Sequence, residues 1–296
     1  MPRPRHLIVI ALFALLIASA ATLSPPAASR HAAFGGRGIE LGRGARTTIV
    51  LVHGLGSRAE HWLPVARWLA RRHRVELVDL PGHGETDMPE PFSLERATAA
   101  LDASLAQISN DPVILVGHSL GGLIAAAEAI SHPSRIRGLV LVETALRPQI
   151  PEAQRAHALE RLDHDYSNLI HEAYLGFGRD SAQGEALYHE VAALDPRVVK
   201  RWIRLAWSTD LSKQAKSLDL PVLVVLNDRS WGSDESWASV ADALGYSGAP
   251  RLRAVRLTDC GHFVMLDRPA ELATLIEGFA ADPERAGVAG RQSLPR

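Results

Sequence analysis

Short apolar runs that alternate with helical patterns constrain this 296-residue chain more than any other feature. Five runs are rich in Val, Ile and Leu without polar alternation: Ile49–Val52, Val75–Val78, Val113–Val116, Leu139–Val142 and Val222–Leu226. Strands of this composition are buried on both faces, as in a parallel sheet. Apolar residues at helical spacing separate them, as at Trp62, Val65 and Leu69. We therefore expect an α/β fold with a mostly parallel central sheet flanked by helices.

Residues 145–218 interrupt this alternation, because they contain helical patterns but no strand candidate. The helical segments lie near 152–164, 184–194 and 196–208. Pro151 and Pro196 fit the first turns of two of them. We expect this stretch to form a helical cap that is inserted before the penultimate strand and covers one end of the sheet.

The N-terminus has the features of an export signal. Arg3 and Arg5 make it positive, an apolar run follows, and Ala18–Ala20 has the small residues of a cleavage site. The run is near the shortest length that crosses a bilayer, so an uncleaved membrane anchor is the alternative. We expect a periplasmic or secreted protein. In the alternative, an uncleaved N-terminus anchors the protein and is its only membrane contact. The predicted parts are 1–23 as signal or anchor, 24–38 as linker, 39–144 and 219–281 as core, and 282–296 as flexible tail.

Composition excludes several partners and cofactors. The formal net charge is -1 with acids and bases interspersed, so the basic stripe that nucleic acid would require is absent from the sequence. Cys260 is the one cysteine, which rules out an intrachain disulfide and a pair of metal-ligating cysteines. We expect no metal and no nucleic acid, and composition leaves the oligomeric state open.

The stretch Gly117–Gly122 reads G-H-S-L-G-G between a predicted strand and a predicted helix. A serine in G-x-S-x-G at this place is a nucleophile elbow, a tight turn that presents the hydroxyl at the carboxyl edge of the sheet. Glycines two residues before and after the serine avoid clashes in the turn. Ser119 is therefore the candidate nucleophile.

A serine hydroxyl needs a base to react near neutral pH. Most of the thirteen histidines are expected on the surface or in the core. On this kind of scaffold the order along the chain is serine, acid, histidine. His262 is the one histidine that follows His189, so it is the candidate base.

The segment His53-Gly54-Leu55-Gly56 directly follows the first apolar run, where the second oxyanion donor is expected. We expect the N–H groups of Leu55 and Leu120 to form the oxyanion hole, with His53 and Gly54 against the substrate. Each such donor contributes roughly 3 kcal/mol in the transition state. In the cap, Trp202 and Trp207 are candidates for lining an acyl pocket, although apolar residues at helical spacing more often pack inside the core of such a cap.

Together these motifs resemble the α/β-hydrolase superfamily in its capped, esterase-like branch. The resemblance runs from Thr47 to Phe279 and rests on His53-Gly54, Asp79–Gly84, Gly117–Gly122 and Gly261–Phe263. It implies a serine hydrolase that acts on a small-molecule ester or related acyl bond without a cofactor. It also implies that Asp79–Gly84 is mainly structural and lines the mouth of the site. Ser119 argues against the dehalogenase and epoxide hydrolase branches, whose nucleophile is Asp.

The third member of the triad has two candidates. The resemblance places the acid after the fifth apolar run, where Ser230 stands at the usual position and Asp228 lies two residues earlier. Some members carry the acid one strand earlier, and here Glu143 follows the fourth run. A carboxylate at the end of a buried strand is costly unless it is paired, and a histidine would pair it. We favour Glu143 and keep Asp228 as the alternative.

The function that these residues indicate is acyl transfer to Ser119 followed by hydrolysis. Carbon–carbon bond hydrolases and peptidases use the same scaffold, and the fold alone cannot separate them from esterases. A non-catalytic binding protein is the rival from a different class, and the missing acid at Ser230 favours it slightly.

Overall fold

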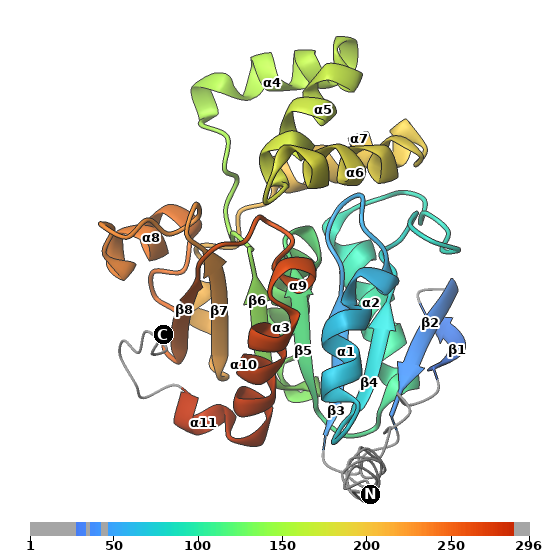
Figure 1. Ribbon diagram of the computed structural model, residues 1–296, viewed down its shortest axis with the longest axis vertical. Helices are drawn as coiled ribbons and strands as arrows, with labels where there is room; N and C mark the ends of the chain where they lie inside the picture. The colour runs from blue at the N-terminus through green and yellow to red at the C-terminus, as the bar shows by residue number, and fades with distance from the viewer. Residues whose placement is uncertain (1–27, 34–35, 43–46, 287–296) are drawn as a thin grey trace, which may run out of the picture.

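An eight-stranded sheet forms the centre of the computed structural model, which describes residues 28–33, 36–42 and 47–286 (Figure 1). The strands are β1 (Ala28–Ala33), β2 (Gly36–Leu41), β3 (Thr48–Val52), β4 (Arg74–Val78), β5 (Val113–His118), β6 (Ile136–Val142), β7 (Val222–Asn227) and β8 (Leu252–Leu257). Their order across the sheet is β1-β2-β4-β3-β5-β6-β7-β8. The β1–β2 and β2–β4 pairs are antiparallel and the other pairs are parallel. This confirms the predicted mostly parallel sheet, and all five predicted apolar runs lie in its strands.

Helices cover both faces of the sheet because the inner strands are apolar on both sides. The helices are α1 (Leu63–Leu69), α2 (Leu94–Ile108), α3 (Leu120–Ser131), α4 (Glu152–His164), α5 (Tyr166–Phe177), α6 (Ser181–Ala192), α7 (Pro196–Ser208), α8 (Trp237–Leu244), α9 (Val264–Asp267), α10 (Pro269–Ala281) and α11 (Pro283–Ala286). Residues of α1, α9 and α10 pack into the apolar core on one face, and those of α2, α3 and α8 into the core on the other.

Helices α4 to α7 lie between β6 and β7 in the chain and stand over one end of the sheet (Figure 1). Two predicted cap segments, 152–164 and 196–208, coincide with α4 and α7. The segment expected near 184–194 is α6, which begins three residues earlier. Helix α5 was not predicted.

The ends of the chain differ from the expectation in two places. Strand β1 and the start of β2 lie in the segment 24–38, so its described residues, 28–33 and 36–38, are paired backbone rather than a linker. Helix α11 occupies the start of the expected tail 282–296. The predicted signal or anchor, residues 1–23, lies outside the described residues. Among the residues that are described, no helix is both long and apolar enough to cross a bilayer.

The register of the parallel strands brings three loops together at one edge. His118 at the end of β5 pairs with Val142 at the end of β6, and Val142 pairs with Val225 near the end of β7. The residues that follow these strands therefore emerge side by side. Ser119 and Glu143 are two of them, and both lie at the edge that the cap covers.

Candidate active site

Ser119 occupies the turn between β5 and α3, as the elbow motif predicts. Its φ of 51° and ψ of -118° are unfavourable for a residue with a side chain, at a cost of about 1–3 kcal/mol. The fold holds this conformation, because the Ser119 N–H donates to the Val142 carbonyl at 2.9 Å and the Ser119 carbonyl accepts from the Leu123 N–H at 3.1 Å. A Cβ at Gly121 would collide with the His53 carbonyl oxygen, so the elbow needs glycine there.

Glu143 and His262 are brought together at the same edge. The Nδ1 atom of His262 lies 3.1 Å from Oε2 of Glu143, whose side chain is 1% exposed. Two further donors reach this carboxylate: the Asn227 N–H at 2.6 Å to Oε1 and the Ser230 hydroxyl at 2.8 Å to Oε2. Because a carboxylate only accepts hydrogen bonds, Nδ1 carries the proton and Nε2 is left as the basic nitrogen.

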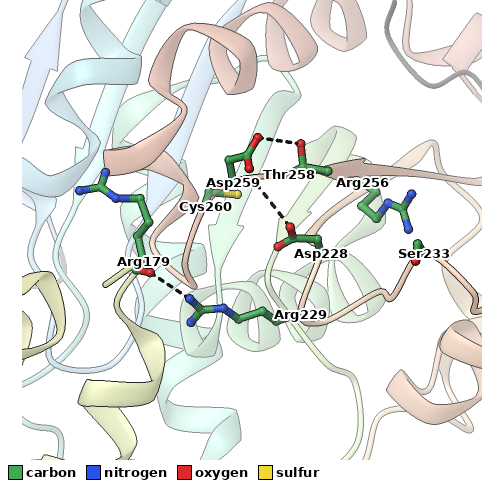
Figure 2. A pocket seen from close by; sticks show the side chains of 8 residues that line it. All are labelled: Arg179, Asp228, Arg229, Ser233, Arg256, Thr258, Asp259 and Cys260. Atoms are coloured by element: carbon green, nitrogen blue, oxygen red, sulfur yellow. Dashed lines mark hydrogen bonds between the residues drawn. The ribbon is translucent and has the colours of Figure 1, made fainter. Parts of the chain in front are cut away.

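Asp228, the alternative acid, lies elsewhere. Its Oδ2 faces the Asp259 backbone N–H at 3.5 Å, and its side chain lines a cavity of about 500 Å³ together with Arg256 and Cys260 (Figure 2). Ser230, at the position where the resemblance places the acid, is instead a donor to the Glu143 carboxylate. The geometry therefore pairs His262 with Glu143 and leaves Asp228 outside this network.

Both candidate oxyanion donors lie beside the elbow. An ideal Cβ on Gly54 would be 3.1 Å from the Ser119 Cβ, so the loop after β3 lies directly against the candidate nucleophile. The Gly54 carbonyl accepts from the Nδ1–H of His53 at 2.7 Å, and the N–H of Leu55, in the same trans peptide, points the opposite way. Leu120 is the first residue of α3, so helix geometry gives its N–H no acceptor within the helix.

His53 does not face the substrate side, contrary to the expectation. It is fully buried, and its Nε2 accepts the Leu80 N–H at 3.0 Å while its Nδ1 donates to the Gly54 carbonyl. The Nδ1 side of the ring thus holds the loop after β3, and the Nε2 side faces Leu80 and Asp79, whose Oδ1 lies 3.2 Å away. For a histidine that directly follows a buried strand, the sequence does not distinguish contact with the substrate from support of the loop.

His83, in the Asp79–Gly84 loop, also holds the backbone of the loop after β3. Its Nε2 accepts the Gly56 N–H at 3.2 Å and its Nδ1 lies 3.2 Å from the Pro81 carbonyl. Burial lowers the pKa of His83 to about 3, with a smaller contribution from His53, so the ring is neutral and can accept. The family resemblance implies a structural role for this loop and assigns none to the histidine itself.

His118 is a further residue that the sequence did not single out. Its Nε2 is 3.0 Å from the His262 carbonyl oxygen, and the two rings are 4.8 Å apart. Burial, and then the charge of neighbouring His262, hold the pKa of His118 well below its usual range. The neutral ring therefore donates to the His262 backbone and supports the loop that carries the candidate base.

The two tryptophans proposed for the acyl pocket lie in different surroundings. Trp202 is fully buried, its indole N–H donates to the Pro81 carbonyl at 2.9 Å, and its ring packs on Phe92 at 4.6 Å. Trp202 therefore ties the cap to the core, and this contact supports the packing role over a place in an acyl pocket. Trp207 is half-buried and packs against the apolar core that includes the cap interior.

Within the described ranges, one cluster offers three metal-ligating side chains, those of Asp102, Glu128 and His132. It lies on α2 and at the end of α3 and contains none of the candidate site residues. The candidate active site consists of a serine, a histidine, a carboxylate and backbone amides.

Comparisons with known proteins identify the family of this chain. Residues 49–275 match the model of the alpha/beta hydrolase family. A pimeloyl-[acyl-carrier protein] methyl ester esterase of Edwardsiella ictaluri is 29% identical over 78% of this chain and 92% of the esterase. Polyketide synthase ThaQ of Burkholderia thailandensis is 30% identical over 86% of this chain, which spans 13% of that synthase.

Solved structures agree in fold. A hydrolase from Oleispira antarctica has a TM-score of 0.72 and 17% identity over 83% of this chain and 94% of that one. An enol-lactonase from Burkholderia xenovorans has a TM-score of 0.70 and 22% identity over 86% and 100% of the two chains. The family match covers well over half of the residues, and this chain belongs to the alpha/beta hydrolase family.

Proposed function

We propose that this chain is a serine hydrolase that cleaves a carboxylic ester or related acyl bond through an acyl-enzyme on Ser119. The observation that carries the proposal is the His262–Glu143 pair, 3.1 Å apart, at the sheet edge where the strained elbow presents Ser119. A buried carboxylate that fixes the tautomer of a histidine is the support that a serine nucleophile requires.

The proposed reaction proceeds in two steps. His262 Nε2 takes the Ser119 proton as the hydroxyl oxygen attacks the carbonyl carbon, and the Leu55 and Leu120 N–H groups bind the oxyanion. The tetrahedral intermediate expels the alcohol, which leaves with the proton from His262. Water then attacks the acyl-enzyme by the same route and releases the acid. Glu143 keeps its charge and stabilises the imidazolium in both steps.

The choice of an ester rather than another acyl bond is supported by the esterase of Edwardsiella ictaluri, which matches over nearly its whole length. The argument for a non-catalytic binding protein was the missing acid at Ser230. Glu143 weakens that argument, because it supplies a buried carboxylate to His262 from the neighbouring strand.

The test is burst-phase release of chromophore from a short-chain p-nitrophenyl ester. We expect a burst equal to the enzyme concentration followed by steady turnover, and we expect Ser119→Ala to abolish both while its melting temperature stays close to that of the parent. Folded parent protein that gives neither burst nor turnover with esters of several chain lengths contradicts the proposal.

A further inference from the structure

Helix α5 of the cap contacts both halves of the candidate catalytic machinery. Tyr174 and Phe177 lie one turn apart on this helix, and their rings are 5.3 Å apart. We propose that α5 is a positioning element, in which Tyr174 aligns the Leu55 amide for the oxyanion and Phe177 orients the His262 imidazole. The inference rests on the proposed function and gives the cap a role beyond covering the site.

Tyr174 reaches the loop after β3 through its hydroxyl. That hydroxyl donates to the Leu55 carbonyl at 2.7 Å. Tyr174 is 2% exposed, and burial raises the pKa of its hydroxyl, so the group remains a donor. Gly56 has a φ of 65°, and a Cβ at this residue would collide with the Tyr174 hydroxyl. The loop therefore depends on glycine at the point where the cap tyrosine approaches it.

The two peptide planes that flank Leu55 are each held by hydrogen bonds. The first plane carries the Leu55 N–H, and His53 holds it through the Gly54 carbonyl. The second plane is held at its carbonyl by Tyr174 and at its N–H by the Nε2 atom of His83. An oxyanion donor is effective when its direction is fixed before the reaction. Of these three groups, Tyr174 is the one that comes from the cap.

Phe177 supports the candidate base in two ways. Its carbonyl accepts the His262 backbone N–H at 2.8 Å, and its ring stacks on the imidazole with centroids 4.5 Å apart and planes 24° apart. Arg229, in the loop after β7, donates to the Gly176 and Gly178 carbonyls at 3.0 and 2.9 Å. The backbone on both sides of Phe177 is thus tied to the core of the protein.

Arg229 also donates to the Arg179 carbonyl at 3.0 Å, as Figure 2 shows. The Asp267 side chain, 1% exposed, adds a second tie: it accepts the Gly261 N–H at 2.8 Å and the Gln183 amide of the cap at 2.7 Å. The cap is consequently fixed to the histidine loop at this end.

The experiment removes one hydroxyl and compares it with a matched control. Tyr174→Phe deletes the donor to Leu55, whereas Tyr188→Phe makes the same change on α6, where the hydroxyl is 3.3 Å from the Ser167 hydroxyl. For the ester that the parent hydrolyses, we expect Tyr174→Phe to lower kcat about tenfold with KM within about twofold, the effect of one neutral hydrogen bond. Tyr188→Phe should leave both constants unchanged.

The second measurement is inhibition by a trifluoromethyl ketone that matches the acyl group of the substrate. Its tetrahedral adduct places an oxyanion against the Leu55 amide, so Tyr174→Phe should weaken its binding by the same factor as kcat/KM. A merely structural role for the hydroxyl would not produce this match. Phe177→Leu keeps the backbone contact and removes the stacked ring, and we expect kcat to fall about fivefold.

The outcomes are separable. An active parent with Tyr174→Phe indistinguishable from Tyr188→Phe overturns the inference alone, as does a change confined to KM. A folded parent without any ester turnover overturns the proposed function and this inference with it. The matched loss of kcat/KM and ketone affinity supports both.

Discussion

Replacing Glu143 by glutamine changes the charge of the buried acid and almost nothing of its shape. The Asn227 N–H donates to Oε1 of Glu143 at 2.6 Å, so the amide oxygen of the new side chain must stay at that position. The amide nitrogen then takes the place of Oε2 and faces Nδ1 of His262, now 3.1 Å from Oε2. Since an NH₂ group only donates, Nδ1 must accept and the imidazole proton moves to Nε2. In Glu143→Gln the base thus has the wrong tautomer.

The size of the loss follows from that tautomer. A base that carries its proton on Nε2 cannot take the Ser119 proton, and the comparable change in a Ser-His-Asp protease costs ~10⁴ in kcat. This corresponds to about 5.4 kcal/mol of transition-state stabilisation at 1.36 kcal/mol for each tenfold. KM should change little, because the Glu143 side chain is only 1% exposed and is therefore shielded from a bound substrate. The assay is steady-state hydrolysis of a p-nitrophenyl ester, normalised to the folded fraction by circular dichroism.

Asp228→Asn is the matched control, because it also replaces a carboxylate by an amide. Asp228 lies two residues from Ser230, but its carboxylate faces the Asp259 N–H and not His262. We expect its kcat to stay within about threefold of the parent, as for a surface change away from the reacting groups. The reasoning about the acid is refuted if Asp228→Asn is the more damaging variant, or if Glu143→Gln keeps more than a tenth of the parent activity.

Three further predictions concern the support of the site. Ser230→Ala removes one of the donors to Glu143 and should lower kcat about fivefold without changing the melting temperature by more than a few degrees. Gly54→Ala places a methyl group 3.1 Å from the Ser119 Cβ, so we expect at least a tenfold loss of kcat in a protein that still melts cooperatively. The folded-state pKa of His83 is about 3, below its value of about 6.5 when unfolded, so the unfolded chain binds the extra proton between these values. The free energy of unfolding should therefore fall by a few kcal/mol as the pH drops from about 6.5 toward 3. Urea titrations should show that this free energy depends less on pH in His83→Gln than in the parent.

The sequence predicted the sheet well because its strands are continuous apolar runs that few other structures accommodate. It missed β1 and β2, whose pairing is antiparallel and joins the edge of the sheet, where no apolar run is required. It also gave no range for β8, the strand at the opposite edge, whose sequence LRAVRL includes two arginines. It also missed α5, although Ile170, Tyr174 and Phe177 have the spacing of one helical face. That helix is amphipathic within a longer helical region, and the sequence does not mark its boundaries.

The site was only partly predictable for a different reason. Ser119 and His262 follow from motif and order along the chain, which are local properties. The choice between Glu143 and Asp228 depends on which carboxylate reaches the His262 imidazole in the folded chain. Glu143 does so although it lies 119 residues before His262 in the sequence. The burial of His53 depends likewise on the neighbouring Leu80 backbone. Such contacts are properties of the assembled sheet edge.

The position of the acid is a property of two adjacent strands taken together. Val142 at the end of β6 pairs with Val225 near the end of β7. A carboxylate on either following loop can therefore approach the same histidine, provided that the other loop supplies donors. Here β6 supplies Glu143, and the loop after β7 supplies the Ser230 hydroxyl at 2.8 Å. Ser230→Asp alone should be inactivating, because a second carboxylate would lie against the first and one of them would be protonated. In the Glu143→Gln background the same change restores a single carboxylate at the usual position. We expect the double variant to hydrolyse the p-nitrophenyl ester at least tenfold faster than Glu143→Gln, and equal rates would show that the two loops are not interchangeable.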